Sequence, residues 1–580
     1  DQNGLLKTQD SWQRVNLRTK LNHQVNSWLN TGVNFNLSNG LRFIGSDAAW
    51  FSAYHAVPVL PVYDEENYNE LVDSGIEYPS NYASAQLLGY RGAQNPMIQL
   101  DYNNNRQDIR KMFSGAYAEI ELIPYKLRFR SEYNVSMMFI KGRNVGLPYY
   151  ITTNTIRDVS TITSDRTTEI NHFLDNTLTY TDNFGGHNIT AMIGTSYRDE
   201  WWDYLRASAS DVPLNENSWY IGQSRLAESK TADDSAERLY GISYFGRLSY
   251  NFENRYIAYF TLRQEGTSKY QDKWGTFPAF GLGWVVSEEP FLQGVNFINF
   301  LKIRGGWGQL GNDKIPREDG ANTTNPIFLA IDDQQVNGTI TTSTFGYLEW
   351  ETVTGTNIGI SARLLNGRLS LESDYYIRDT ENAAIPVSLK LQPGSVLRNV
   401  GVIRNSGLET ALTWNGNITT DLRYTISGNV ATLKNEVLDL YGQQYINGGQ
   451  AEFRQRAEVG HPLFAFYGYE VAGIYQNEAE IDADPVAVEN SLQPGDFKFR
   501  DQQQEGEEGY GVIDDEDKVF LGSYFPSLTY GGSFGLSYRN LEFSVYITGQ
   551  NGNKILNRKR GEIIWTNDTN FDAELATNLW

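Results

Sequence analysis

The chain has no cysteine among its 580 residues and only 5 histidines. The lack of cysteine excludes disulfides, thiolate metal sites and cysteine nucleophiles together. The histidines show no H-E-x-x-H or comparable metal-ligand spacing, so the sequence carries no signature of a zinc enzyme. P-loop, G-x-S-x-G and kinase motifs are also absent. These absences predict that the chain is not an enzyme.

Long apolar runs and positive charge are both scarce. No stretch of about eighteen apolar residues occurs, which excludes a transmembrane helix. Lysine and arginine total 48 against 70 acidic residues, giving a net charge of -22. Nucleic acid requires a basic surface, so the sequence predicts no nucleic-acid partner. The acidity is compatible with divalent cations and an outer leaflet bridged by them, and equally with colloidal repulsion alone.

Aromatic residues and glycine are abundant. The chain has 36 Tyr, 28 Phe, 13 Trp and 53 Gly. Tyrosine and tryptophan suit a membrane–water boundary because each has an apolar body and a polar tip. A mean hydropathy of -0.47 does not exclude a membrane protein, since only alternate residues of a barrel strand face lipid.

Apolar and polar residues alternate with period two from end to end. Tyr256, Ala258, Phe260 and Leu262, for example, fall on one face of a predicted strand. Short turns at 250–256 and 536–543 join some strands, whereas long polar loops join others. This arrangement is typical of an outer-membrane barrel, and we count roughly sixteen to eighteen strands. A soluble sandwich or propeller could share the alternation, but we find no blade-length repeat. Short polar helices are expected in loops at 63–75 and 477–485.

Several sequence words occur in a recognisable order. Residues 254–312 contain NRY, LRQEGTS, WGTFP, GLGW, LKIR and GQLGN, and residues 350–380 read WETVTGTNIGISARLLNGRLSLESDYYIRDT. VGHPLFAFYGYEVAGIYQ and PGDFKFRD follow. The chain closely resembles the SusC/RagA group of TonB-dependent outer-membrane transporters over nearly its whole length.

The resemblance implies an all-β fold, a transmembrane antiparallel β-barrel with long extracellular loops. An intact member has about 22 strands and this chain fewer. We therefore expect residues 1–580 to be a β-barrel domain, an internal portion of a longer chain, with the plug domain and the terminal strands outside it.

The resemblance also implies TonB-dependent import of oligosaccharides or oligopeptides across the outer membrane of a Gram-negative, Bacteroidota-like cell. The implied partners are a SusD-like surface lipoprotein, the TonB–ExbB–ExbD system acting through the plug, and outer-membrane lipid or lipopolysaccharide. A dimer of SusC–SusD pairs is implied as well. A passive porin or adhesin and a secreted β-rich glycan-binding protein are the alternatives.

An acidic loop at 501–517 is the candidate metal site. It resembles the family's calcium-like loop, and its candidate ligands are Asp501, Asp514, Asp515 and Asp517. Gln503 replaces the usual Asn, and EGEEGY is inserted before Gly511. The alternative is a solvated acidic turn that shapes an extracellular loop. Apart from this Ca²⁺, no cofactor is expected.

Two aromatic pairs are the candidate substrate-binding residues: Trp201 with Trp202, and Trp219 with Tyr220. Adjacent aromatics cannot share one face of a strand, so we expect the first pair in a loop or at a boundary. Their rings could stack on sugars or peptide side chains. Packing in a loop or an aromatic girdle is the alternative.

A G-x-G-x-x-G pattern at Gly306, Gly308 and Gly311 follows a predicted strand. A dinucleotide site would need a helix next, but the following residues have no helical periodicity. We therefore expect these glycines to permit a strand-to-loop transition.

Overall fold

The computed structural model describes residues 2–3, 10–90, 94–292, 294–314, 322–331, 334–343, 348–388, 395–449 and 454–557. Long strands build most of this part of the chain, as the alternation predicts. The wall strands are β2 (Ser11–Gln24), β3 (Leu29–Phe43), β4 (Asn103–Ile123), β5 (Leu127–Gly146), β8 (Thr161–Phe184), β9 (His187–Ser210), β10 (Thr231–Phe252), β11 (Tyr256–Thr267), β12 (Trp274–Val285), β13 (Ile298–Asn312), β16 (Glu351–Leu364), β17 (Leu369–Ser388), β18 (Ser395–Asn417), β19 (Leu422–Thr432), β20 (Lys434–Asp439), β27 (Leu528–Tyr538) and β28 (Leu541–Asn551).

Shorter elements lie in the connections between these strands. The short strands are β1 (Gln2–Asn3), β6 (Tyr149–Thr152), β7 (Thr155–Arg157), β14 (Asn322–Ile331), β15 (Gln334–Ser343), β21 (Tyr445–Gly448), β22 (Gln455–Glu458), β23 (Ala465–Tyr469), β24 (Val471–Ile474), β25 (Phe497–Phe499) and β26 (Lys518–Gly522). The helices are α1 (Asp47–His55), α2 (Glu65–Asp73), α3 (Pro96–Asp101), α4 (Glu478–Asp482) and α5 (Pro485–Glu489). Helices α2 and α4 fall where the sequence predicts short polar helices, whereas α1, α3 and α5 were not predicted. No helix in the described ranges is both long and apolar enough to cross a membrane.

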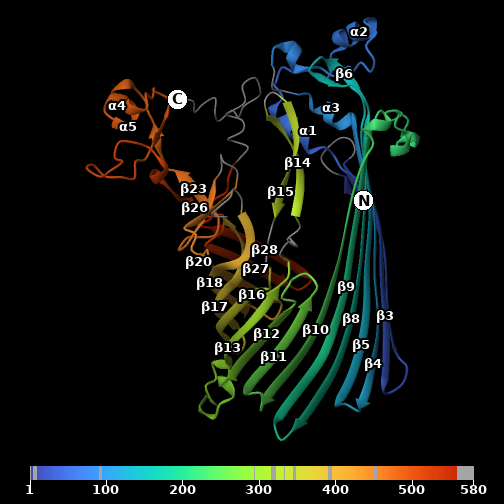
Figure 1. Cartoon of the computed structure of the whole chain (residues 1–580). Helices are drawn as coiled ribbons and strands as arrows, with labels where there is room; N and C mark the ends of the chain where they lie inside the picture. The colour runs from blue at the N-terminus through green and yellow to red at the C-terminus, as the bar shows by residue number, and fades with distance from the viewer. Residues whose placement is uncertain are drawn as a thin grey trace.

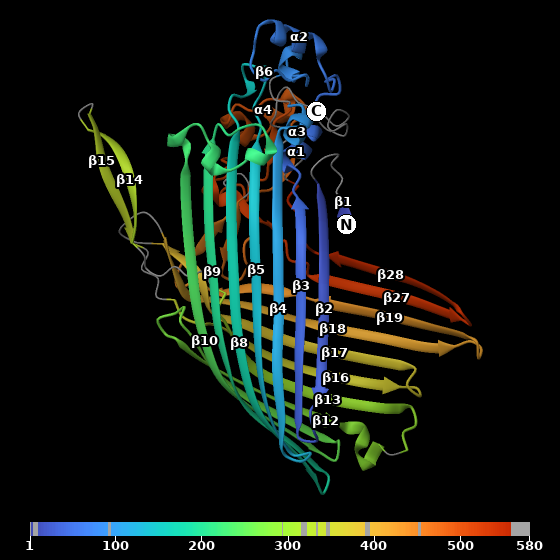
Figure 2. The same ribbon diagram turned by 90° about the vertical axis from the view of Figure 1, so that its right-hand side faces the viewer.

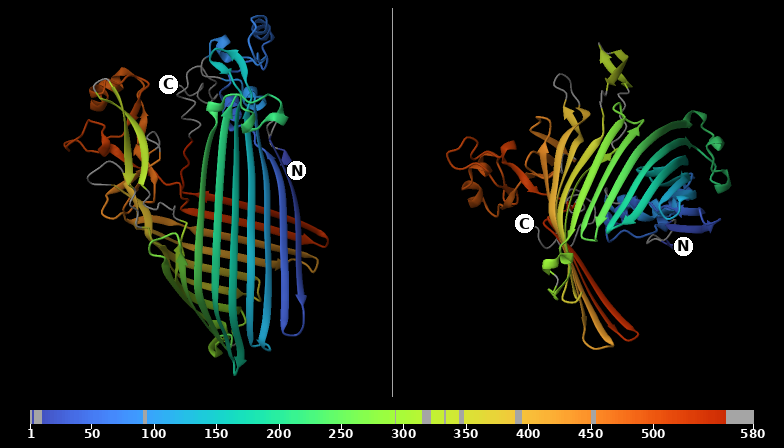
Figure 3. Two further views of the ribbon diagram at one scale, coloured as in Figure 1. Left: turned by 45° about the vertical axis from the view of Figure 1, so that its right-hand side comes forward. Right: turned by 90° about the horizontal axis from the view of Figure 1, so that it is seen from below.

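The wall is one antiparallel sheet of 18 strands, with β1 at one margin and β28 at the other. Each wall strand pairs with the next wall strand along the chain, except that β19 and β20 both pair with β18 and β19 pairs onward with β27. The sheet curls strongly, and β2 does not pair with β28 in the described part of the chain (Figure 3). The all-β, antiparallel prediction is confirmed.

Turns and loops segregate to opposite ends of the wall (Figure 1). Tight turns at 185–186, 253–255 and 539–540 join strands at one end. Segments 44–102, 211–230 and 440–527 connect them at the other end and carry the helices and small sheets. This is the short-turn, long-loop arrangement that the sequence predicts.

The strand register assigns every wall residue to one of two faces, because directly opposite residues of an antiparallel pair share a face. Phe260 lies opposite Leu248 on one side and Phe280 on the other. Following such pairs across the sheet places one apolar side chain after another on a common surface, the apolar face. The intervening residues form the polar face.

The apolar face is open over much of its area. Ile193, Leu282 and Ile358 keep 63%, 64% and 61% of their surface exposed. Monomeric proteins in water rarely expose so large a contiguous apolar surface, so this face is suited to hydrocarbon. The buried clusters lie in the loop region instead, as with Tyr82, Ile98 and Ile151.

The G-x-G-x-x-G glycines lie inside strand β13 and pair with β16, so the predicted strand-to-loop transition is wrong. They make room for neighbouring side chains. A Cβ at Gly311 would overlap the ring of Phe277, and one at Gly308 would lie 2.7 Å from the Cβ of Ala279. The pattern therefore serves packing between β12 and β13.

Candidate functional site

The polar face carries several ion pairs along the wall. Arg198 on β9 pairs with Asp313 and lies 3.9 Å from the carboxylate of Glu265 on β11. Farther along the sheet, Arg304 on β13 binds the carboxylate of Asp374 on β17. Charges on this face are compatible with a wet interior, whereas lipid-facing charges would be costly.

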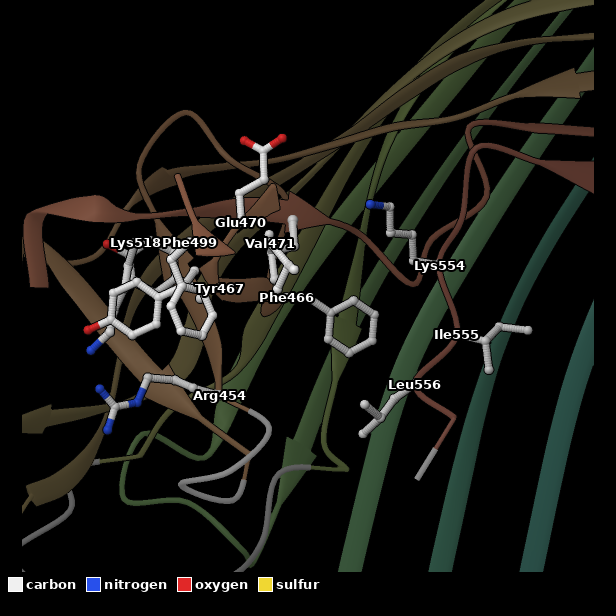
Figure 4. Close-up of a pocket in the computed structure, with 13 residues that line it drawn as sticks. Arg454, Phe466, Tyr467, Glu470, Val471, Phe499, Lys518, Lys554, Ile555 and Leu556 are labelled. Atoms are coloured by element: carbon white, nitrogen blue, oxygen red, sulfur yellow. The ribbon is translucent and has the colours of Figure 1, made fainter. Parts of the chain in front are cut away.

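A groove of about 710 Å³ lies in the loop region, between the small strands of segment 440–527 and residues 554–556 (Figure 4). Its aromatic lining comes from Phe466, Tyr467, Tyr469 and Phe499. Three cationic side chains also line it: Arg454, Lys518 and Lys554. Stacking surfaces beside hydrogen-bond donors are suited to sugar rings and to peptide side chains.

Two cations fix the aromatic rings of this groove. The Arg456 guanidinium lies 3.6 Å from the centroid of Tyr467 and 3.8 Å from that of Tyr445. Lys518 Nζ lies 5.0 Å from the centroid of Tyr469 and also binds Asp515. The hydrogen bond from Lys518 lowers the pKa of Asp515, and the same bond raises the pKa of Lys518. Lys518 is therefore cationic at neutral pH.

The acidic loop brings together two of its four predicted ligands. Asp501 accepts backbone N–H groups from Gln503 at 2.9 Å and Gly511 at 2.7 Å. Asp517 is fully buried and accepts the N–H groups of Gln502 and Asp514, both at 2.8 Å.

The Gln503 side-chain amide donates hydrogen bonds to both carboxylates when its nitrogen faces them, at 2.7 Å from Asp517 and 2.8 Å from Asp501. Asp514 instead caps the turn at Asp515–Asp517. The Asp515 side chain is 88% exposed and pairs with Lys518. The described residues contain no group of three or more acidic or histidine side chains placed to hold a metal ion.

The four predicted aromatic residues do not form one site. Trp201 and Trp202 lie within strand β9, so the predicted loop position is wrong. Trp201 faces the apolar side, whereas Trp202 faces the polar side and stacks on Tyr204 with centroids 5.9 Å apart. Successive residues of a strand point to opposite sides, and the strand extends beyond the position where a loop was expected.

Trp219 and Tyr220 lie in the 211–230 loop, where one is buried and the other is exposed. Trp219 is 6% exposed and packs with Val145 and Ile162, so no open ring face is left for a ligand. Tyr220 is 54% exposed, and the Arg143 guanidinium lies 4.7 Å from its centroid. The groove aromatics were missed from sequence, although the clusters AFYGYE and FKF contain them.

Comparison with known proteins identifies the family. Residues 124–463 match the model described as "TonB dependent receptor-like, beta-barrel". The chain belongs to this family. TonB-dependent receptors are outer-membrane β-barrel proteins, and they are transporters rather than enzymes.

Curated relatives cover almost the whole chain. TonB-dependent receptor P26 of Formosa agariphila is 28% identical over 96% of this chain and 55% of its own length. TonB-dependent receptor SusC of Bacteroides thetaiotaomicron is 25% identical over 96% and 55%. The chain thus spans about half the length of these relatives.

Among solved structures, the RagAB peptide transporter superposes with a TM-score of 0.74. The match covers 93% of this chain and 58% of that chain at 18% identity. At this identity the likeness shows the fold alone. Together with the family model, it confirms the predicted resemblance to SusC and RagA.

Proposed function

We propose that this chain forms the wall and outer loops of a TonB-dependent importer of oligosaccharides or oligopeptides. The two-faced wall is the observation that supports the proposal, because one face presents apolar rows suited to lipid and the other carries ion pairs suited to a wet interior. Family membership supports energy coupling through TonB. The SusC and RagAB likenesses support a partnership with a SusD-like lipoprotein over the loops.

In this proposal the loop groove contacts the substrate. Rigid strands hold its rings, and the loop region stands where a substrate arrives from outside. The aromatic planes favour ring-bearing or apolar parts of the substrate, while Arg454 and Lys554 offer donors to its hydroxyl, carbonyl or acidic groups.

Uptake by cells that express the full reading frame tests the function. Labelled oligosaccharides and labelled oligopeptides are supplied separately, with and without TonB. We expect uptake of one class that stops when TonB is deleted, and co-purification of a surface lipoprotein. Uptake that survives without TonB would indicate a passive porin. Recovery of the protein in the soluble fraction would indicate a secreted binding protein.

Two phenylalanines of strand β25 provide a matched test of the groove. Phe499 lines the groove, whereas Phe497 is 58% exposed and outside the lining. We expect Phe499→Ala to weaken substrate binding about three- to tenfold, as loss of an aromatic contact does, and Phe497→Ala to leave it unchanged. Equal effects of the two variants would remove the groove from the substrate path.

Calcium at the acidic loop stays a prediction. Asp501 and Asp517 supply hard oxygen ligands, which Ca²⁺ prefers. The Gln503 amide nitrogen between them can take the place of a cation. Calorimetry of the intact protein with Ca²⁺ tests the site, and Gln503→Asp should strengthen binding by adding a carboxylate. No heat of binding in either protein would remove the idea.

A further inference from the structure

The apolar face contains a row of uncharged polar side chains, separate from the Asp199–Arg238 ion pair that lies nearer the loops on the same face. Reading the register from β5 to β11, directly opposite residues on this face are Ser131, Asn176, Thr195, Tyr244 and Gln264. Strands β5, β8, β9 and β10 lie side by side (Figure 2), and β11 follows beside β10 (Figure 1). All five side chains are uncharged and can hydrogen-bond.

An apolar row borders this polar row toward the turns, and a row that also contains Tyr133 and Tyr197 borders it toward the loops. Toward the turns lie Leu178, Ile193 and Leu262, and toward the loops lie Leu174 and Ile242. Asn176 is about 26 Å along the strand from Phe184, at about 3.3 Å per residue. At a tilt of about 40° this is a height of about 20 Å, inside the apolar band of about 25 Å. Short turns face the periplasm in such barrels, so the row lies within the outer leaflet.

In the described part of the chain, three members of the row have no hydrogen-bond partner for their side chains: Ser131, Tyr244 and Gln264. Asn176 donates to Thr195 Oγ1 at 3.4 Å. Within the described ranges, no residue hydrogen-bonds to the Tyr244 hydroxyl or to the Gln264 side-chain amide. Tyr244 instead stacks on Trp274, with centroids 6.2 Å apart. Unpaired polar groups are costly in hydrocarbon, so a lipid group or water must pair with them there.

A trough of about 800 Å³ lies beside this polar rim. Its apolar lining is formed chiefly by Leu178, Ile193, Leu248, Phe260 and Leu262. Gly246 lies at its floor, where a Cβ would meet nothing closer than the Met192 carbonyl oxygen at 3.6 Å. The volume is within the range of about 300–1,000 Å³ that is usual for small-molecule pockets. The only charged lining residue, Arg247, belongs to the polar face and lies over Tyr259.

We propose that the trough over Gly246 binds one acyl chain of an outer-leaflet lipopolysaccharide, with Tyr244 and Gln264 hydrogen-bonding the polar groups at the head of that chain. Amide, ester and hydroxyl groups at the start of such a chain match uncharged donors and acceptors. The lipid phosphates, which would need cations, lie beyond this uncharged rim. The inference rests on the outer-membrane location of the family and is independent of what the protein transports.

Native mass spectrometry of the full protein, purified from outer membranes in mild detergent, tests the proposal. The wild type should retain one lipopolysaccharide. Gly246→Leu adds a side chain to the trough at a position with room for its Cβ and should abolish retention. Gly305→Leu is the matched control, because Gly305 lies on the same face opposite Leu282 and has similar free space, its nearest atom at 3.7 Å. It should retain the lipid as the wild type does.

Gln264→Leu separates hydrogen bonding from simple filling of the trough. It should lower retention about fivefold, the usual worth of one net hydrogen bond. No retained lipid in the wild type, a phospholipid in place of lipopolysaccharide, or equal retention in Gly246→Leu would each overturn the proposal. Failure of the protein to reach the outer membrane would instead overturn the proposed function.

Discussion

An arginine placed on the apolar face should destabilise the protein, whereas the same arginine one residue along should not. Leu248 lies on that face, opposite Ala191 and Phe260, and is 48% exposed. Ser249 lies on the polar face, opposite Thr190. The pair therefore changes one variable, the side of the wall that receives the charge.

The expected loss of stability follows from the depth of Leu248 within the apolar band. Leu248 is about 13 Å along β10 from the strand end at Phe252, which corresponds to a height of about 10 Å at a tilt of about 40°. This is near the middle of an apolar band of about 25 Å, where a lipid-facing arginine costs about 2–4 kcal/mol. Leu248→Arg should therefore lower the folding equilibrium constant by about 30- to 1,000-fold. Ser249→Arg should change it by less than about 1 kcal/mol, despite the loss of a 3.3 Å hydrogen bond from Arg247.

Equilibrium unfolding of the full protein in lipid vesicles, followed by its heat-modifiable migration on gels, measures both variants. Leu248→Asn is a useful control, because it removes the leucine without adding a charge and should have a smaller effect than Leu248→Arg. If both arginine variants unfold at the same denaturant concentration, the two faces are not in different solvents, and the membrane assignment of this register is refuted.

The remaining predictions concern the loop region. Trp219→Ala should destabilise the 211–230 loop by about 3–5 kcal/mol because a buried indole is lost, whereas Tyr220→Ala should cost little, and hydrogen exchange of the loop amides distinguishes them. Burial alone would raise the pKa of Asp484, but hydrogen bonds from Tyr475 and Lys498 outweigh it and lower that pKa. Because the pKa of Asp484 is lower in the folded protein, its carboxylate stabilises the fold fully above the ordinary carboxyl pKa of about 3.9. This stabilisation is lost as the pH falls through the lower, folded value. Tyr475→Phe should make the stability of the 471–499 segment depend less on acid. Proteolysis of this segment across about pH 2–5, a range around the ordinary carboxyl pKa, measures the change.

Much of the fold could be read from the sequence because a strand's alternation is a local property. Tyr256, Ala258, Phe260 and Leu262 share a face wherever the strand is placed, and the 250–256 turn forces the next strand to return beside it. Short sequence motifs indicated the family for the same reason, since they correspond to local turns and strand ends. Two short helices of the long loops, α2 and α4, were also predictable from local polarity.

Only the tertiary structure could decide which residues of neighbouring strands lie opposite one another. Trp201 and Trp202 are neighbours in sequence, yet they lie on opposite faces of the wall, and Trp219 is buried by strands that lie far from it in the chain. The loop groove gathers residues from five separate segments, and the polar row joins five strands through their register. Register depends on hydrogen-bond pairing between distant segments, and no period within a single strand encodes it.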